Sequence, residues 1–131
     1  MPTTAHGTFF WNELMTWNVD KAKAFYGETL GWHYESHPMA DGGTYTLCKA
    51  GEAMAAGIFE MKPGTGFDGV PDHWFSYITV DDIDARLEGV EAAGGEVCRP
   101  AFDVPDTGRF AVVKDSAGAF IGWVTPIERG C

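Results

Sequence analysis

The spacing of apolar residues in the first half of the chain predicts a strand, a helix and three further strands. Residues 9–17, FFWNELMTW, form an aromatic and apolar run that is typical of a strand. Apolar residues recur at helical spacing over residues 19–30, between Asn18 as the N-cap and Gly31, which can take the left-handed conformation that ends a helix. Three strands are predicted next, at residues 32–38, 43–49 and 53–61, with the turn residues Asp41-Gly42-Gly43 between the first two.

The same pattern returns in the second half, shifted by 64 positions. Three pairs of positions mark the shift: Trp11 with Phe75, Gly31 with Gly95, and Ile58 with Gly122. The predicted elements of this half are a strand at 73–80, a helix at 82–94, and strands at 96–103, 108–114 and 119–126. A repeat of this length that occurs only twice indicates two copies of one supersecondary module.

We therefore predict an α+β fold in which two tandem βαβββ modules form curved, mostly antiparallel sheets around a cavity. Residues 1–131 are expected to form a single domain, with module one at about 8–61, a glycine- and proline-rich linker at 62–72, and module two at about 73–126. A chain of this size buries enough surface to fold without disulfides or a structural metal.

Composition excludes several classes of partner. The chain has 19 acidic and 9 basic residues, and no cluster of Lys and Arg is present to bind a phosphate backbone. No apolar run is long enough to cross a membrane, and the N-terminus does not resemble a signal peptide. The three cysteines have no CxxC spacing, which favours a reducing compartment and a cytoplasmic protein.

Several short motifs together resemble the vicinal oxygen chelate superfamily, which includes glyoxalase I, extradiol dioxygenases and bleomycin-resistance proteins. The motifs are Ala24-Phe25-Tyr26-Gly27, Leu30-Gly31-Trp32, Thr79-Val80-Asp81-Asp82, Gly94-Gly95 and Asp115-Ser116-Ala117-Gly118-Ala119. The opening Trp11-Asn12-Glu13-Leu14-Met15-Thr16 is similar to a glyoxalase-like subgroup. The resemblance covers about residues 8–126 and implies a homodimer as the assembly.

In the enzymes of this superfamily, a divalent metal is held by side chains of the first and last strands of each module. The resemblance places those positions at Trp11, Ile58, Phe75 and Gly122, none of which carries a ligand atom on its side chain. We therefore predict that the protein binds no metal and needs no cofactor. This puts glyoxalase and dioxygenase chemistry in doubt.

Strand alternation places Glu13 on the same face as Trp11, and places Tyr77 and His73 on the same face as Phe75. Glu13 and Tyr77 are repeat partners, so an acid and a phenol are expected to face each other across a pseudo-twofold axis. Glu13 could serve as a general base or anchor a ligand, or it could be a carboxylate paired for structural reasons. The predicted ligand-binding residues are Trp11, Glu13, Ile58, His73, Phe75, Tyr77 and Gly122.

Three functions remain open from the sequence. The favoured one is a metal-free protein that binds a small molecule, which is apolar or aromatic and can carry a positive charge. The second is a metal-dependent lyase or dioxygenase that uses the displaced ligands Glu13, His73 and Glu60. The third is a structural or regulatory module whose cavity is filled by its own side chains. The sequence does not decide whether the modules pair within one chain or exchange between chains.

Overall fold

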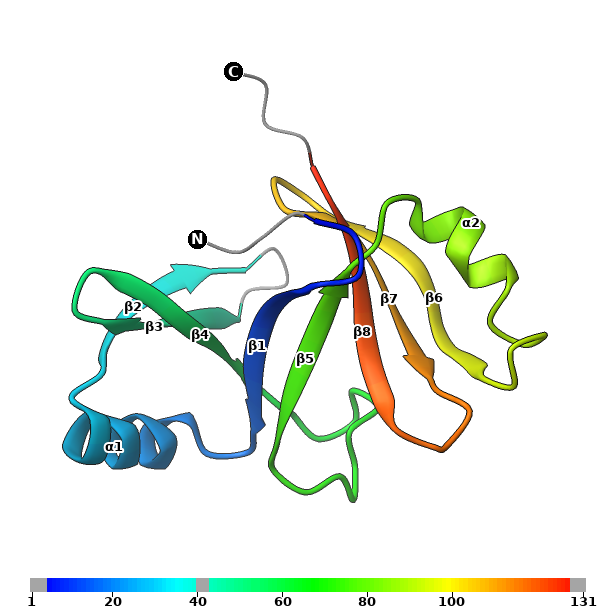
Figure 1. The fold of residues 1–131 in the computed structure, drawn as a ribbon. Coiled ribbons are helices and arrows are strands. Elements are labelled where there is room, and N and C mark those ends of the chain that lie inside the picture. Colours follow the sequence, from blue (N-terminus) through cyan, green and yellow to red (C-terminus); the bar gives the residue numbers. More distant parts are fainter. Residues whose placement is uncertain (1–4, 40–42, 128–131) are drawn as a thin grey trace. The chain divides into compact units, whose positions relative to one another are not determined.

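The computed structural model describes residues 5–39 and 43–127, and these divide into two compact units. Unit 1 is Asn12–Phe75, and unit 2 combines the chain from Ser76 onward with the segment that ends at Trp11. Strand β1 (Phe9–Thr16) thus begins in unit 2 and ends in unit 1, whereas β5 (His73–Thr79) begins in unit 1 and ends in unit 2 (Figure 1).

In unit 1 the strands lie in the order β2-β3-β4-β1. The antiparallel neighbours are β2 (His33–Pro38), β3 (Thr44–Ala50) and β4 (Ala53–Glu60), and β4 pairs in parallel with β1. The observed boundaries of these strands agree with the predicted ones to within about one residue at each end. The turn predicted at Asp41-Gly42-Gly43 includes positions outside the described residues.

In unit 2 the strands lie in the order β5-β8-β7-β6. The antiparallel neighbours are β6 (Glu96–Val104), β7 (Gly108–Lys114) and β8 (Phe120–Pro126), and β8 pairs in parallel with β5. Both units therefore follow the same route of strand, helix and three strands. The α+β fold with two βαβββ modules and mostly antiparallel sheets is confirmed.

Helix α1 (Val19–Leu30) begins and ends where its caps predict. The Asn18 side chain accepts a hydrogen bond from the backbone N–H of Lys21 at 3.0 Å. Gly31 has φ 72°, and its N–H donates to the carbonyl oxygen of Gly27 at 3.1 Å. A residue with a side chain is strained in that conformation, so glycine is what makes the helix stop here.

Helix α2 (Ile83–Glu88) is shorter than the helix predicted over residues 82–94. Asp82 is its N-cap, and the Asp82 side chain accepts a hydrogen bond from the backbone N–H of Ala85 at 3.2 Å. Gly89 ends it, and the chain continues in turns, with the N–H of Gly95 donating to the carbonyl of Val90 at 2.9 Å. A glycine in a helix interior costs about 1 kcal/mol relative to alanine. The spacing of apolar residues does not reveal this cost, so the helix was predicted to continue past Gly89.

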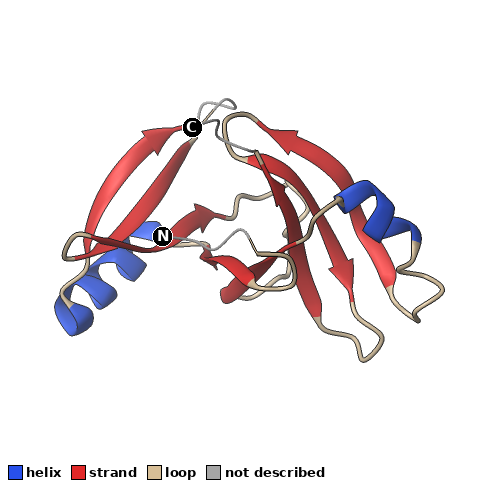
Figure 2. Cartoon of the chain, turned by 45° about the horizontal axis from the view of Figure 1, so that its top comes forward, coloured by secondary structure: helices blue, strands red, loops and turns tan. Residues whose placement is uncertain are grey.

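Each sheet has one face covered by the helix of its own unit (Figure 2). The buried core of unit 1 consists of Leu14, Cys48, Ala56 and Ile58, packed against α1 residues that include Val19, Ala22 and Tyr26. The buried core of unit 2 consists of Val80, Ile83 and Ala111, packed against Leu87, Ala101 and Trp123. We call the opposite side of each sheet the helix-free face of that unit.

Cys48 packs as a small apolar residue: it is fully buried, and burial raises the pKa of its thiol to about 11. Cys98 is exposed. None of the described helices is long and apolar enough to cross a membrane.

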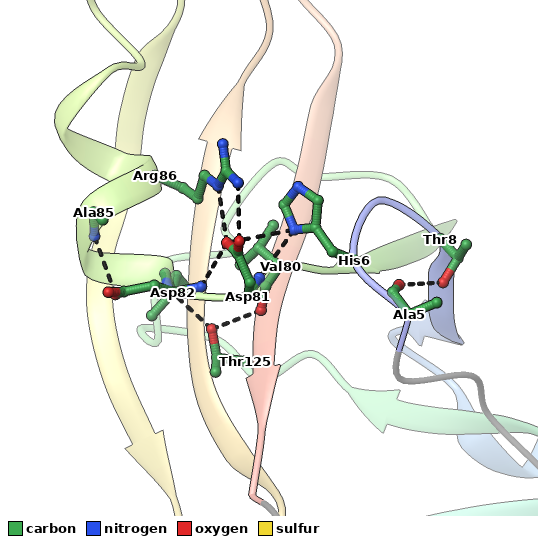
Figure 3. Close-up of polar contacts among 10 residues, drawn as sticks. Ala5, His6, Thr8, Val80, Asp81, Asp82, Ala85, Arg86 and Thr125 are labelled. Atoms are coloured by element: carbon green, nitrogen blue, oxygen red, sulfur yellow. Dashed lines mark hydrogen bonds and ion pairs between the residues drawn. The ribbon is translucent and has the colours of Figure 1, made fainter.

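The junction between β5 and α2 is held by a group of polar contacts (Figure 3). Asp81 receives two hydrogen bonds from the Arg86 guanidinium, both at 2.9 Å, and its own backbone N–H donates to Nδ1 of His6 at 3.0 Å. The Arg86 guanidinium and the backbone N–H of Asp82 hold the pKa of the Asp81 carboxyl well below its usual range. Thr125 of β8 accepts from the N–H of Ile83 and donates to the carbonyl of Val80.

Candidate functional site

The helix-free face of unit 1 contains a buried carboxylate. Glu13 of β1 is only 8% exposed, and the hydroxyl of Tyr45 on β3 donates to its Oε2 at 2.7 Å. A hydrogen bond to an ionised acceptor is among the stronger ones in proteins, and it offsets part of the cost of burying the carboxylate. The structure therefore joins Glu13 to a phenol within its own unit.

The hydrogen bond between Tyr45 and Glu13 passes over β4, the strand that lies between β3 and β1. Gly57 of β4 lies opposite Glu13 in the register, between the strands that carry the two side chains. A Cβ atom at Gly57 would lie 1.7 Å from the Tyr45 hydroxyl oxygen and 2.3 Å from its Cζ. Only glycine leaves room for the phenol to reach across β4.

The helix-free face of unit 2 carries a row of aromatic rings. Tyr77 of β5 meets Phe110 of β7 edge to face, with ring centroids 5.4 Å apart, and Phe110 stacks on Phe102 of β6 at 6.0 Å. Gly122 of β8 is buried and lies opposite Tyr77 in the register. Aromatic rings beside a few polar groups are typical of small-molecule binding surfaces. We call Tyr77, Phe110 and Phe102 the aromatic row.

Three further predicted residues are half-buried: Trp11, His73 and Phe75. The rings of His73 and Phe75 are nearly perpendicular, with centroids 6.3 Å apart. Nδ1 of His73 lies 2.8 Å from the carbonyl oxygen of Pro71, which sets the orientation of the imidazole. Contact of these residues with a ligand stays a prediction.

Ile58 does not lie on the face that was predicted for it. Its side chain is 1% exposed and belongs to the core beneath α1. The register explains the error: Glu13 lies opposite Gly57, and its repeat partner Tyr77 lies opposite Gly122, so Gly57 and not Ile58 matches Gly122. The turn before the last strand is longer in unit 2, at residues 115–119, than the Gly51-Glu52 turn of unit 1.

The residues present do not fit the divalent metal that the fold family implies. The first-strand positions Trp11 and Phe75 offer no donor atom, and neither do Gly57 and Gly122 at the corrected last-strand positions. Among residues 5–39 and 43–127, no group of three or more His, Cys, Asp or Glu side chains is placed to hold a metal ion.

The proposed set of displaced ligands is wrong in one respect. Glu60 lines a polar hollow of about 520 Å³ beside α1, together with Val19 and Lys23 of that helix. Glu13 is on the opposite face of the same sheet, opposite Gly57. Two carboxylates on opposite faces of a sheet cannot bind one metal ion at ligand distances of ~2.0–2.2 Å.

Sequence reasoning missed the partners of Glu13 and Tyr77. Tyr45 pairs with Glu13, and Phe110 contacts Tyr77. The signal for Tyr45 was Gly57, since a glycine inside an apolar strand marks a close approach by another group. Nothing comparable in the sequence identifies Phe110, because its neighbour is set by the pairing of β7 with β8.

Comparison with known proteins assigns the fold to a family. The model of the Glyoxalase/Bleomycin resistance protein/Dioxygenase superfamily matches residues 8–122. The chain belongs to this superfamily. The resemblance inferred from the short motifs is thereby confirmed.

Two curated relatives extend the comparison. The Mycobacterium tuberculosis protein named "Putative glyoxylase CFP32" is 42% identical over 123 residues, which are 94% of this chain and 46% of that protein. The anthracycline biosynthesis protein DnrV of Streptomyces peucetius is 31% identical over 141 aligned positions, covering 99% of this chain and 51% of that protein. The chain spans about half the length of the curated relatives it matches.

Solved structures share the fold at low sequence identity. Methylmalonyl-CoA epimerase from Mycobacterium tuberculosis superposes with a TM-score of 0.64 and 20% identity, over 98% of this chain and 94% of the epimerase chain. The Streptomyces coelicolor epimerase, solved with 2-nitronate-propionyl-CoA, gives a TM-score of 0.66 and 15% identity, over 95% of this chain and 100% of the epimerase chain. At these identities the likeness concerns the fold.

Proposed function

We propose that this member of the superfamily is a metal-free protein that binds a small planar aromatic molecule on its helix-free faces. The observation that carries the proposal is the contrast between the donor-poor metal positions and the aromatic row of Tyr77, Phe110 and Phe102. The match to an anthracycline biosynthesis protein supports an aromatic ligand. A metal-dependent lyase or dioxygenase is supported less, because Glu13 and Glu60 lie on opposite faces.

On the helix-free face of unit 1, the pair of Glu13 and Tyr45 would recognise the polar substituent of an aromatic ligand bound on that same face. A buried carboxylate beside a phenol suits an amine or a hydroxyl, since both can donate a hydrogen bond to it. Burying ~150–250 Å² of an aromatic ligand at ~25 cal/mol per Å² contributes roughly 4–6 kcal/mol. Association costs reduce this sum, so we expect affinities between micromolar and millimolar.

Replacing Glu13 with glutamine tests the role of its charge. Glutamine still accepts hydrogen bonds from Tyr45 and from a ligand hydroxyl but carries no charge. Naphthalene-2-methylamine should therefore bind roughly tenfold more weakly, while the affinity for naphthalene-2-methanol should change by less than about twofold. Glu60→Gln is the matched control, because it removes the same charge from the other face of the same sheet. Isothermal titration calorimetry measures the affinities of wild type, Glu13→Gln and Glu60→Gln for both ligands. Binding of the amine that is equal in wild type and Glu13→Gln contradicts this role, and binding of neither ligand contradicts the proposed function.

We also propose that the protein is a homodimer in which unit 1 contributes an apolar surface. Trp74 is 43% exposed, and Phe25 and Leu30 of α1 are more exposed still. Trp74 lines a shallow hollow of about 400 Å³ with Phe25 and Tyr26. Exposed apolar groups that gather in this way are typical of interaction surfaces, and a symmetric pair is the commonest assembly.

Light scattering at micromolar concentration is expected to give the mass of two chains, and Trp74→Glu is expected to shift that mass toward one chain. The added carboxylate would have to lose its water at a buried apolar contact, which is costly. Phe120→Glu is the control, since Phe120 is an exposed aromatic residue of unit 2. A wild-type protein that is monomeric throughout would refute the dimer.

A further inference from the structure

Arg99 differs from the other described arginines in its surroundings. Arg86 pairs with Asp81, and Arg109 pairs with Asp84 and Asp103. The Arg99 guanidinium carbon instead lies 3.7 Å from the centre of the Phe102 ring. Within the part of the chain that the structure describes, no carboxylate forms an ion pair with Arg99, although the protein has 19 acidic residues and a net charge of −10.

The backbone of β6 is irregular on both sides of Arg99. The pairing of β6 with β7 shifts register between Val97 and Arg99 and again between Arg99 and Phe102. β-bulges of this kind re-aim a side chain and are frequent beside binding sites. Here they bring the guanidinium over Phe102, at the end of the aromatic row.

The row and the guanidinium together form one surface on unit 2. Tyr77, Phe110 and Phe102 supply ring faces and edges at centroid spacings of 5.4 and 6.0 Å. Arg99 is exposed, so its N–H donors can reach a bound molecule. A guanidinium is planar, keeps its charge at any physiological pH, and offers two parallel N–H groups that match a carboxylate.

We propose that Arg99 and the aromatic row form an anion-selective subsite for a planar aromatic carboxylate, with the ring system against the row and the carboxylate on the guanidinium. This proposal rests on the proposed function and names the class of molecule that unit 2 selects. The charge complementarity is local: the chain is strongly acidic, yet no carboxylate among residues 5–39 and 43–127 forms an ion pair with this cation. An aromatic ring beneath it also lowers the cost of leaving it unpaired.

The test compares two ligands that differ only in charge, naphthalene-2-carboxylate and naphthalene-2-methanol, by isothermal titration. Wild type should bind the carboxylate more tightly than the alcohol. Arg99→Gln should lower the affinity for the carboxylate about tenfold, as expected for loss of a charged hydrogen bond. Its affinity for the alcohol should stay within about twofold of the wild-type value. Arg86→Gln is the control, because it removes the same charge from an arginine that Asp81 already neutralises.

Each result decides between the two proposals. The subsite is refuted, while the proposed function stands, if Arg99→Gln binds the carboxylate as tightly as wild type does. The same holds if Arg86→Gln lowers the affinity for the carboxylate as much as Arg99→Gln does. If wild type binds neither naphthalene compound, both proposals fail. Phe102→Leu should weaken both compounds if the ring system lies on the row, and unchanged binding of both in that variant would also refute the subsite. Circular dichroism of each variant checks that the substitution leaves the fold intact.

Discussion

Ile58→Ala is expected to lower the free energy of unfolding by about 2–5 kcal/mol, the usual cost of truncating a fully buried isoleucine. The side chain is 1% exposed and packs with Leu14, Cys48 and Ala56 beneath α1. Removing three carbon atoms there leaves a cavity between the helix and the sheet. Urea denaturation followed by circular dichroism measures the loss.

Ile127→Ala is the matched control, because the same atoms are removed from a side chain that is 48% exposed. It should change the stability by less than about 0.5 kcal/mol. Under native conditions Ile58→Ala should bind naphthalene-2-methanol as wild type does. A variant of normal stability that had lost ligand binding would instead place Ile58 at the ligand, as the repeat alone had predicted.

The order of elements could be predicted from the sequence because each carries a local signal. Asn18 and Gly31 fix the ends of α1 through a side-chain hydrogen bond and a left-handed φ, and neither needs a tertiary contact. The second helix was predicted too long because its apolar spacing continues past Gly89. Hydrophobic periodicity reports which face would be buried, and it does not report the backbone cost of a glycine.

The face on which a strand residue lies was harder to predict. A shift of one residue moves a side chain to the other side of a sheet, so the single offset that aligns Trp11 with Phe75 assigns Ile58 to the wrong face. The parallel pairings of Glu13 with Gly57 and of Tyr77 with Gly122 give the correct equivalence. Those pairings depend on turn length and on the bulge after Cys48, which the apolar pattern does not encode.

The chemistry of the candidate site was predicted only in part. Glu13 and Tyr77 were identified from alternation along their own strands, which is a local property. Tyr45 contacts Glu13 across β4, 32 positions away in the chain, and such a contact leaves little trace in a single sequence. Arg99 reaches Phe102 on its own strand, but its position depends on the register shifts between β6 and β7, which the apolar pattern does not reveal.

Gly57→Ala is expected to destabilise the protein by about 2 kcal/mol, although alanine is normally favoured over glycine in a strand by roughly 0.5–1 kcal/mol. The new Cβ would lie 1.7 Å from the Tyr45 hydroxyl oxygen, so the phenol must swing away. Its hydrogen bond to Glu13 is then lost, and a carboxylate that is 8% exposed loses that donor. Chemical denaturation measures the change.

A double-mutant cycle with Tyr45→Ala separates this cause from a general effect on the strand. In the Tyr45→Ala background no phenol stands above Gly57, so Gly57→Ala should be neutral or stabilising by up to about 1 kcal/mol. The two substitutions should therefore be strongly non-additive. If Gly57→Ala costs the same in both backgrounds, the glycine is needed for the strand itself and not for the passage of Tyr45. Tyr45→Phe isolates the hydrogen bond, because it removes the hydroxyl and keeps the ring above Gly57. It should lower the free energy of unfolding by about 1–3 kcal/mol through the lost hydrogen bond to Glu13 alone.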